Sequence, residues 1–230
     1  MFQRKKSQYT ILQNRVRVVW TCLRALAVHS IIAILLLFAA SGCLRAQSTS
    51  SDVNWLIKVL DLKEGSHVAD IGAGDGGQTL AIARYIGEKG HIFSTELGEE
   101  SVEELQEEIE NSDFNNIDVL EAHTTHTNLP EECCEAIYMR RVYHHITDPA
   151  SMNKSLYRTL KPGGKLAVID FEPRGREAEA GERASGSSHG VTLDTVVKEL
   201  QQAGFRILSQ EQRSGRNIYV VAQRPEEVEG

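Results

Sequence analysis

Cysteine is scarce in this sequence of 230 residues, which contains only four. Two of them, Cys22 and Cys43, lie within the first 46 residues, and the other two, Cys133 and Cys134, are adjacent. Adjacent cysteines rarely form a disulfide because the local geometry is strained, so we expect two ordinary buried thiols. The sequence therefore offers no disulfide framework. It also shows no cysteine and histidine spacing typical of zinc sites, and we predict no metal.

Acidic residues are absent from residues 1–46, which carry seven lysines and arginines. Residues 25–44 form a run of twenty without a formal charge, about the length that a helix needs to cross a hydrocarbon layer. A basic start, an apolar run and small residues are typical of a membrane anchor and of a secretory signal peptide. The sequence Ala-Ser-Gly-Cys at residues 40–43 also resembles a lipoprotein cleavage box.

These features divide the N-terminal region into a basic segment (1–24), a transmembrane or signal segment (25–46) and a polar linker (47–52). We expect a membrane-associated or exported protein that contacts the membrane through residues 25–44 if they are not cleaved. If translation starts after Met1, or if the segment anchors a domain that faces the cytosol, the domain lies on the cytosolic side.

The remaining residues, 47–230, are strongly acidic, with a formal charge of about −14. Such a surface repels a phosphate backbone, so we expect no nucleic acid partner. The length suits one domain, residues 53–223, followed by an acidic tail, residues 224–230. No internal repeat and no second domain is visible.

Residues 53–223 alternate between short apolar runs and amphipathic stretches. This alternation indicates a parallel sheet that helices cover on both faces. The last two predicted strands, 205–210 and 217–222, are joined only by a short turn, so they must pair antiparallel. The strands predicted before them are residues 67–71, 91–96, 117–121, 136–142 and 165–171.

Capping residues predict where three of the helices begin. Ser101 forms a capping box with Glu104, Asp148 precedes a proline in a first turn, and Thr192 precedes the last helix. Residues 172–191 form a loop that is long for a compact domain, which indicates a lid or a substrate-binding loop.

The first predicted strand leads directly into the glycine-rich turn Asp70-Ile-Gly-Ala-Gly-Asp-Gly-Gly77. Glycines here let backbone N–H groups approach a ligand at a helix N-terminus, and the pattern G-x-G-x-x-G also occurs in dinucleotide-binding proteins. Asp70 and Asp75 would repel a pyrophosphate but attract a ligand with an ammonium and a sulfonium. Glu96 is suitably placed to accept hydrogen bonds from ribose hydroxyls in either class of protein.

With this turn and the segments 129–130 (LP), 136–148 (AIYMRRVYHHITD) and 160–170 (LKPGGKLAVID), the chain resembles the class I S-adenosylmethionine-dependent methyltransferases of the broad type 11 group. The resemblance spans roughly residues 53–223. It implies an α/β, Rossmann-like sheet of seven strands that is mostly parallel, with helices on both faces and a C-terminal antiparallel hairpin. It also implies that S-adenosyl-L-methionine is the cofactor and binds at the carboxyl ends of the strands.

The resemblance assigns most of the cofactor-binding residues, with one departure. Many relatives have an acid after the third strand that contacts the adenine amino group, whereas this chain has Ala122-His-Thr-Thr-His-Thr-Asn128. We therefore expect Thr124 or a neighbouring side chain to replace that acid. The predicted cofactor-binding residues are Asp70, Gly72, Ala73 and Gly74 for the methionine part, Glu96 for the ribose, and Thr124 and Arg140.

Methyl transfer is an in-line displacement that positioning alone accelerates strongly, and it needs a base only if the acceptor must lose a proton. Tyr143, His144 and His145 follow the fourth predicted strand, which the resemblance places beside the methyl group. They are our candidate catalytic residues, since an imidazole titrates near neutral pH, although packing at the turn is the simpler interpretation. Glu172 is a second candidate base, and His189 is expected to be solvated.

Three functions stay open at this point. The favoured one is an S-adenosylmethionine-dependent methyltransferase that acts on a small-molecule acceptor. A relative that keeps the fold for binding without catalysis is the second, and it fits an exported location better because the methyl donor is a cytosolic metabolite. An NAD(P)-dependent oxidoreductase is permitted by the glycine pattern, but Asp70 and Asp75 argue against it.

Overall fold

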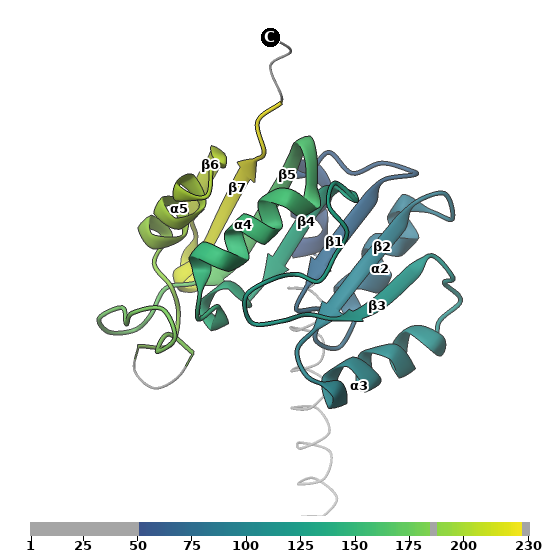
Figure 1. Ribbon diagram of the computed structural model, residues 1–230, viewed down its shortest axis with the longest axis horizontal. Coiled ribbons are helices and arrows are strands. Elements are labelled where there is room, and N and C mark those ends of the chain that lie inside the picture. The colour runs from purple at the N-terminus through teal and green to yellow at the C-terminus, as the bar shows by residue number, and fades with distance from the viewer. Residues whose placement is uncertain (1–50, 185–187, 227–230) are drawn as a thin grey trace, which may run out of the picture. The chain divides into compact units, whose positions relative to one another are not determined.

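The computed structural model describes residues 51–184 and 188–226 (Figure 1). The predicted basic segment, the transmembrane or signal segment and residues 47–50 of the predicted linker lie outside the described residues. So do residues 227–230 of the predicted tail. Within the part that is described, no helix combines the length and the apolar character that a membrane crossing requires.

Seven strands form one sheet in the order β3-β2-β1-β4-β5-β7-β6. The five strands from β3 to β5 in this order run parallel to their neighbours, whereas β7 runs antiparallel to both β5 and β6. The predicted architecture, including the C-terminal hairpin, is therefore confirmed. The strands are β1 (His67–Ile71), β2 (His91–Glu96), β3 (Ile117–Glu121), β4 (Cys134–Arg140), β5 (Leu160–Phe171), β6 (Arg206–Gln212) and β7 (Asn217–Gln223).

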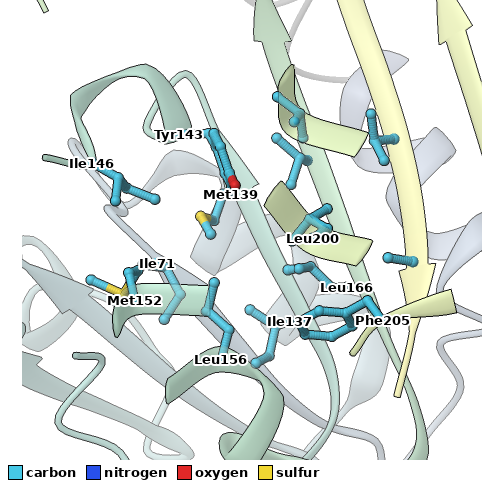
Figure 2. Close-up of a cluster of buried hydrophobic side chains, with 14 of the residues drawn as sticks. Ile71, Ile137, Met139, Tyr143, Ile146, Met152, Leu156, Leu166, Leu200 and Phe205 are labelled. Carbon is cyan, nitrogen blue, oxygen red and sulfur yellow. The ribbon is translucent and has the colours of Figure 1, made fainter. Parts of the chain in front are cut away.

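Side chains along each strand alternate between the two faces of the sheet, and each face carries its own hydrophobic cluster. Helices cover both clusters. In β1, Val68 joins the cluster that contains the helix 51–59 and α2 (Gly77–Ile86). Ile71 joins the other cluster, with α4 (Pro149–Thr159) and α5 (Leu193–Gln202). Figure 2 shows part of this second cluster, where Ile71 and Met152 lie near Leu156. The helix α3 (Glu99–Glu110) packs against β2 and β3.

Two of the three predicted helix caps are confirmed. The side chains of Asp148 and Thr192 each accept a hydrogen bond from the backbone N–H three residues further along, at 3.0 Å and 3.3 Å. The third prediction is wrong, since α3 begins at Glu99, before the predicted capping box at Ser101. Gly98, with a positive φ of 84°, turns the chain into this helix without a side-chain cap.

The predicted linker ends earlier than expected. Ser51 and Asp52 are the first residues of the helix 51–59. The carboxylate of Asp52 is buried, and it accepts hydrogen bonds from Nε of Arg140 (2.7 Å) and from the hydroxyl of Tyr219 (3.0 Å). These contacts tie the start of the domain to β4 and β7, so the folded unit includes Asp52.

Two further sequence predictions are corrected near β4 and after β7. Arg224, the first residue of the predicted acidic tail, belongs to the folded domain, because its guanidinium donates to the carbonyl oxygen of Leu160 (2.6 Å) and pairs with Glu132 (2.8 Å). Cys133 and Cys134 are joined by a disulfide rather than present as two free thiols. This disulfide lies at the start of β4, where the pairing with β5 shifts in register.

Candidate active site

A cavity of about 350 Å³ lies at the carboxyl ends of three neighbouring strands. Its lining includes the last residues of β1, β2 and β4, which are Ile71, Glu96 and Arg140. Open α/β sheets bind ligands at this edge, where the chain leaves each strand in a loop. The volume falls within the range of small-molecule sites.

The glycine-rich turn forms one wall of this cavity. Gly72 and Gly74 both have positive φ, 74° and 58°, a conformation that glycine adopts without strain. The carbonyl oxygen of Thr95 holds the turn by accepting the N–H groups of Gly72 (2.9 Å) and Ala73 (3.0 Å). A Cβ on Gly72 would lie 2.4 Å from Cγ2 of Val142, whereas a Cβ on Gly74 would meet nothing within 4 Å. Packing therefore requires glycine at position 72, and the space beside position 74 stays open.

The carboxylate of Glu96 lies at the edge of the same cavity. Its Oε1 accepts the backbone N–H of Gly74 (2.6 Å), and its Oε2 accepts that of Leu97 (3.0 Å). The two bonds fix the carboxylate between the end of β2 and the glycine-rich turn. Each oxygen has a further lone pair, so the group can accept two more hydrogen bonds from a diol.

Asp70 lies beneath the turn and not in the cavity, which corrects the predicted contact with the methionine part. Its side chain is turned toward α2 by the alternation along β1. There Oδ2 accepts hydrogen bonds from Oγ1 of Thr79 and from the hydroxyl of Tyr138, both at 2.6 Å. Burial raises the pKa of Asp70 to about 6, although both hydrogen bonds act in the opposite direction. Asp70 supports the turn from within the core.

The remaining predicted cofactor-binding residues divide between the cavity and the fold. Thr124 and Arg140 line the cavity, whereas Ala73 does not. Nε of Arg140 also donates to the carboxylate of Asp52, so much of its charge is balanced inside the domain. No acid follows β3 among the residues that line the cavity, in keeping with the departure noted in the sequence.

Tyr143 is a structural residue, which corrects its place among the candidate catalytic residues. It is fully buried in the short 3₁₀ helix η1 (Tyr143–His145). Its hydroxyl donates to Oε2 of Glu199 (3.0 Å) and accepts from Nδ2 of Asn153 (2.7 Å). Burial, and then the charge of Glu199, raises the pKa of Tyr143 well above its usual value. The hydroxyl thus connects η1 to α4 and α5.

His144 and His145 occupy different environments although they are neighbours. His144 is 2% exposed and does not line the cavity, and its Nδ1 lies 2.8 Å from Oδ1 of Asp170. His145 is exposed and lines the cavity. The partial burial of its ring lowers the pKa of His145, which favours the neutral imidazole. Of the three candidate catalytic residues, only His145 faces the cavity.

The structure adds two residues that sequence reasoning missed, Asp170 and His189. Asp170 is buried at the end of β5, inside a segment already singled out by the resemblance. His189 is exposed, as expected, and its Nε2 lies 2.9 Å from Nε2 of His144. Glu172, the second candidate base, accepts a hydrogen bond from Gln212 (2.6 Å) and does not line the cavity.

Residues 69–168 match the family model of the methyltransferase domain. The chain is 27% identical over 110 residues to the ubiquinone/menaquinone biosynthesis C-methyltransferase UbiE of Vibrio vulnificus. It is 24% identical over 114 residues to the demethylmenaquinone methyltransferase of Listeria welshimeri. The two matches cover 47% and 50% of this chain, but only 42% and 48% of those proteins. The chain therefore spans less than half the length of either relative.

Solved structures with the same fold include a SAM-dependent methyltransferase from Aquifex aeolicus. The TM-score is 0.65 at 26% identity, over 75% of this chain and 89% of that one. The [4+2]-cyclase SpnF gives a TM-score of 0.66 at 17% identity, over 76% and 81% of the two chains. At that identity the likeness to SpnF concerns the fold alone.

Proposed function

We propose that this chain is a class I S-adenosylmethionine-dependent methyltransferase that transfers a methyl group from S-adenosylmethionine to a small-molecule acceptor. The observation that carries the proposal is the position of the Glu96 carboxylate. It stands at the cavity, fixed to the glycine-rich turn through the N–H of Gly74 at 2.6 Å. A carboxylate held in this way suits a ribose diol, and the open space beside Gly74 leaves room for the ligand.

The residues around the cavity fit the rest of this cofactor. Apolar side chains of Ile71, Val142 and Met152 line it and can cover an adenine ring or an alkyl chain. The N-terminus of α2, where a pyrophosphate would bind, carries the acid Asp75, whose Oδ1 accepts the N–H of Gly77 (3.3 Å). A carboxylate at that place disfavours a second anion, so the site suits a sulfonium cofactor better than a dinucleotide.

When bound, S-adenosylmethionine supplies a sulfonium methyl group for in-line displacement, and its sulfur keeps the electron pair of the broken carbon–sulfur bond. The chain contributes by holding the two reactants in line within walls that exclude water. His145 faces the cavity, and the partial burial of its ring lowers its pKa, which favours the neutral imidazole. A neutral imidazole can take the proton that a hydroxylated acceptor loses when its oxygen, or a ring carbon that this oxygen activates, forms the bond to the methyl carbon.

The acceptor that we propose is a small hydroxylated aromatic molecule. Two observations support this class: the cavity is lined largely by apolar side chains, and the relatives with the printed names UbiE and demethylmenaquinone methyltransferase act in quinone biosynthesis or on demethylmenaquinone. Arg141 also lines the cavity and can face an oxygen of such a ring.

Calorimetric titration of S-adenosylmethionine and S-adenosylhomocysteine tests the cofactor assignment. We expect saturable binding that weakens about 10- to 100-fold in Glu96→Gln, since hydrogen bonds to a charged group contribute about 1.5–3 kcal/mol. Glu121→Gln is the matched control, because Glu121 is the exposed residue that pairs with Glu96 in β3 and does not line the cavity. Equal affinity in Glu96→Gln and the parent would contradict the assignment, and so would saturable binding of NADH in place of the methyl donor.

The second candidate function is a protein of this fold that binds the cofactor without transferring its methyl group. The same fold occurs in SpnF, which is described as a [4+2]-cyclase, so the fold alone does not decide between the two candidates. Methyl transfer from radiolabelled S-adenosylmethionine to a panel of hydroxylated aromatics separates the two functions. Saturable binding with no transfer to any member of the panel would favour the second.

We also propose that residues 25–44 direct the chain to a membrane or to export, on the evidence of their uncharged composition and the basic residues before them. Cell fractionation of the full-length chain, with the N-terminus of the purified protein read by mass spectrometry, tests this location. An intact N-terminus found only in the cytosolic fraction would contradict it.

A further inference from the structure

Three imidazoles gather beside the cavity, at the end of β5. His144 and His145 come from η1, and His189 comes from the loop before α5. One ring nitrogen of each lies within 4.8 Å of the others. Within residues 51–184 and 188–226, no other set of three histidine, cysteine or acidic side chains comes together in a way that suits a metal ion.

Two of these nitrogens already have the spacing of ligands of a single ion, and the third can reach it after a small movement. Ligands at about 2.1 Å from a metal lie about 3.0 Å apart at a right angle and about 3.4 Å apart at a tetrahedral angle. Nε2 of His144 and Nε2 of His189 are 2.9 Å apart. The widest separation in the group, at most 4.8 Å, must shorten by about 1.4 Å to reach the tetrahedral value. His145 is exposed, so a rotation of its side chain can supply this movement.

Asp170 supports His144 as an outer carboxylate supports a metal ligand. It is 1% exposed, and its Oδ1 lies 2.8 Å from Nδ1 of His144 while its Oδ2 accepts the backbone N–H of the same residue (3.1 Å). A carboxylate at Nδ1 holds the proton on that nitrogen and leaves the lone pair of Nε2 available. In the structure Nε2 forms a hydrogen bond with Nε2 of His189 (2.9 Å), and a bound ion would take the place of this hydrogen bond.

The position of His189 is fixed by the residue that follows it. Gly190 has a φ of 128°, and a Cβ there would lie 2.6 Å from the carbonyl oxygen of Phe171. The N–H of Val191 donates to that same oxygen (3.0 Å), which brings the loop against the end of β5. Further back in the loop, the buried guanidinium of Arg183 pairs with the carboxylate of Glu199 at 2.7 Å.

We propose that His144, His145 and His189 bind one divalent transition-metal ion, such as Zn²⁺, with Asp170 as the outer carboxylate. Imidazole ligands suit zinc, copper, iron and nickel better than magnesium or calcium. Three protein ligands leave a coordination position open. Because His145 lines the cavity, this open position faces the bound molecules.

The open position has a role in methyl transfer, and this role rests on the proposed function. A hydroxyl oxygen of the acceptor bound there loses its proton to water more readily than it does in solution. The electron pair released in this way forms the bond to the methyl carbon, from the oxygen or from a ring carbon conjugated with it, while the sulfonium sulfur keeps the pair of the broken carbon–sulfur bond. In this arrangement His145 holds the metal, which replaces the role of base proposed above for the free imidazole, so removal of the metal slows transfer and leaves cofactor binding intact.

Metal titration of the full-length chain tests the site. After dialysis against a chelator, we expect calorimetry with Zn²⁺ alone to show one ion per chain, and His189→Ala to weaken that binding at least about tenfold. Co²⁺ in place of Zn²⁺ should give the visible absorption of a four- or five-coordinate ion in the parent and not in His189→Ala. His126→Ala is the matched control, because His126 is exposed and its ring centroid lies 4.4 Å from that of His123.

Titration of S-adenosylhomocysteine into the same samples separates the failure of this inference from the failure of the proposed function. His189→Ala should bind S-adenosylhomocysteine as the parent does, which also shows that the variant is folded. Equal Zn²⁺ affinity in His189→Ala and the parent, or an equal loss in His126→Ala, would overturn the metal site while leaving cofactor binding untouched. One-to-one Zn²⁺ binding in a chain that binds no cofactor would support the metal site and refute the proposed function.

Discussion

Replacing Asp70 with asparagine should flatten the pH dependence of the stability of this protein. Burial raises the pKa of Asp70 from 3.8 to about 6 in the folded chain. Between these two values the folded chain holds a proton that the unfolded chain has released. The contribution of this group to the free energy of unfolding is therefore highest below pH 4 and falls as the pH rises through 6.

The size of the effect follows from the shift. About two pKa units correspond to about 3 kcal/mol over the whole window. Between about pH 5 and pH 7.5 the linkage relation gives a loss of about 1.4 kcal/mol, because Asp70 is mostly protonated at the first value and ionised at the second. Asparagine does not titrate, and its carbonyl oxygen can still accept from Thr79 and Tyr138. No hydrogen-bond acceptor is in place for its buried amide N–H, which lowers the free energy of unfolding by about 1–3 kcal/mol at every pH.

Urea denaturation at several pH values measures the effect as a difference between Asp70→Asn and the parent. Other carboxylates titrate in both proteins, so their contributions cancel in the difference. The variant should be the less stable protein at pH 5 and should recover about 1.4 kcal/mol relative to the parent by pH 7.5. Asp113→Asn, at an exposed position, serves as the control. A difference that stays constant over this range would refute the account of Asp70 as a buried acid with a raised pKa.

Three further changes test individual contacts by urea denaturation. Tyr143→Phe should lower stability by about 1–2 kcal/mol and leave cofactor affinity unchanged, because the hydroxyl bonds only within the fold. Asp52→Ala should cost about 3 kcal/mol, since it leaves the partly buried guanidinium of Arg140 without this carboxylate. Gly190→Ala should destabilise the chain and weaken metal binding, because its Cβ would lie 2.6 Å from the carbonyl oxygen of Phe171. For each variant, an unfolding midpoint equal to that of the parent would contradict the contact that the variant tests.

Much of the fold could be predicted because several elements carry local signals. β1, β2 and β3 begin and end at the predicted residues, since each is a short apolar run bounded by glycine or polar residues. The start of β5 could not be predicted in this way. Lys161-Pro-Gly-Gly164 has the composition of a turn, yet the strand begins at Leu160, which pairs with Cys134. That extended conformation depends on the neighbouring strand and leaves no signal in the local sequence.

The candidate site was only partly predictable, for a related reason. Gly72, Gly74 and Glu96 line the cavity, because their positions follow from the ends of two strands, and their contact with a cofactor stays a prediction. The side chain of Asp70 lies on the side of the turn away from the cavity, since the alternation along β1 directs it toward α2. Tyr143 and His145 are two residues apart in one turn of 3₁₀ helix, and only packing decides which of them is buried.

The histidine cluster shows how the sheet itself assembles a site that no spacing in the sequence reveals. Asp170 and His144 are 26 residues apart, and His144 and His189 are 45 apart. The parallel pairing of β4 with β5 continues to Arg140 and Ile169, so the residues just beyond these positions meet at one edge. The loop then returns to the end of β5 through the N–H of Val191. Because the cavity opens at this same edge, a metal held there would act on whatever molecule the cofactor pocket presents.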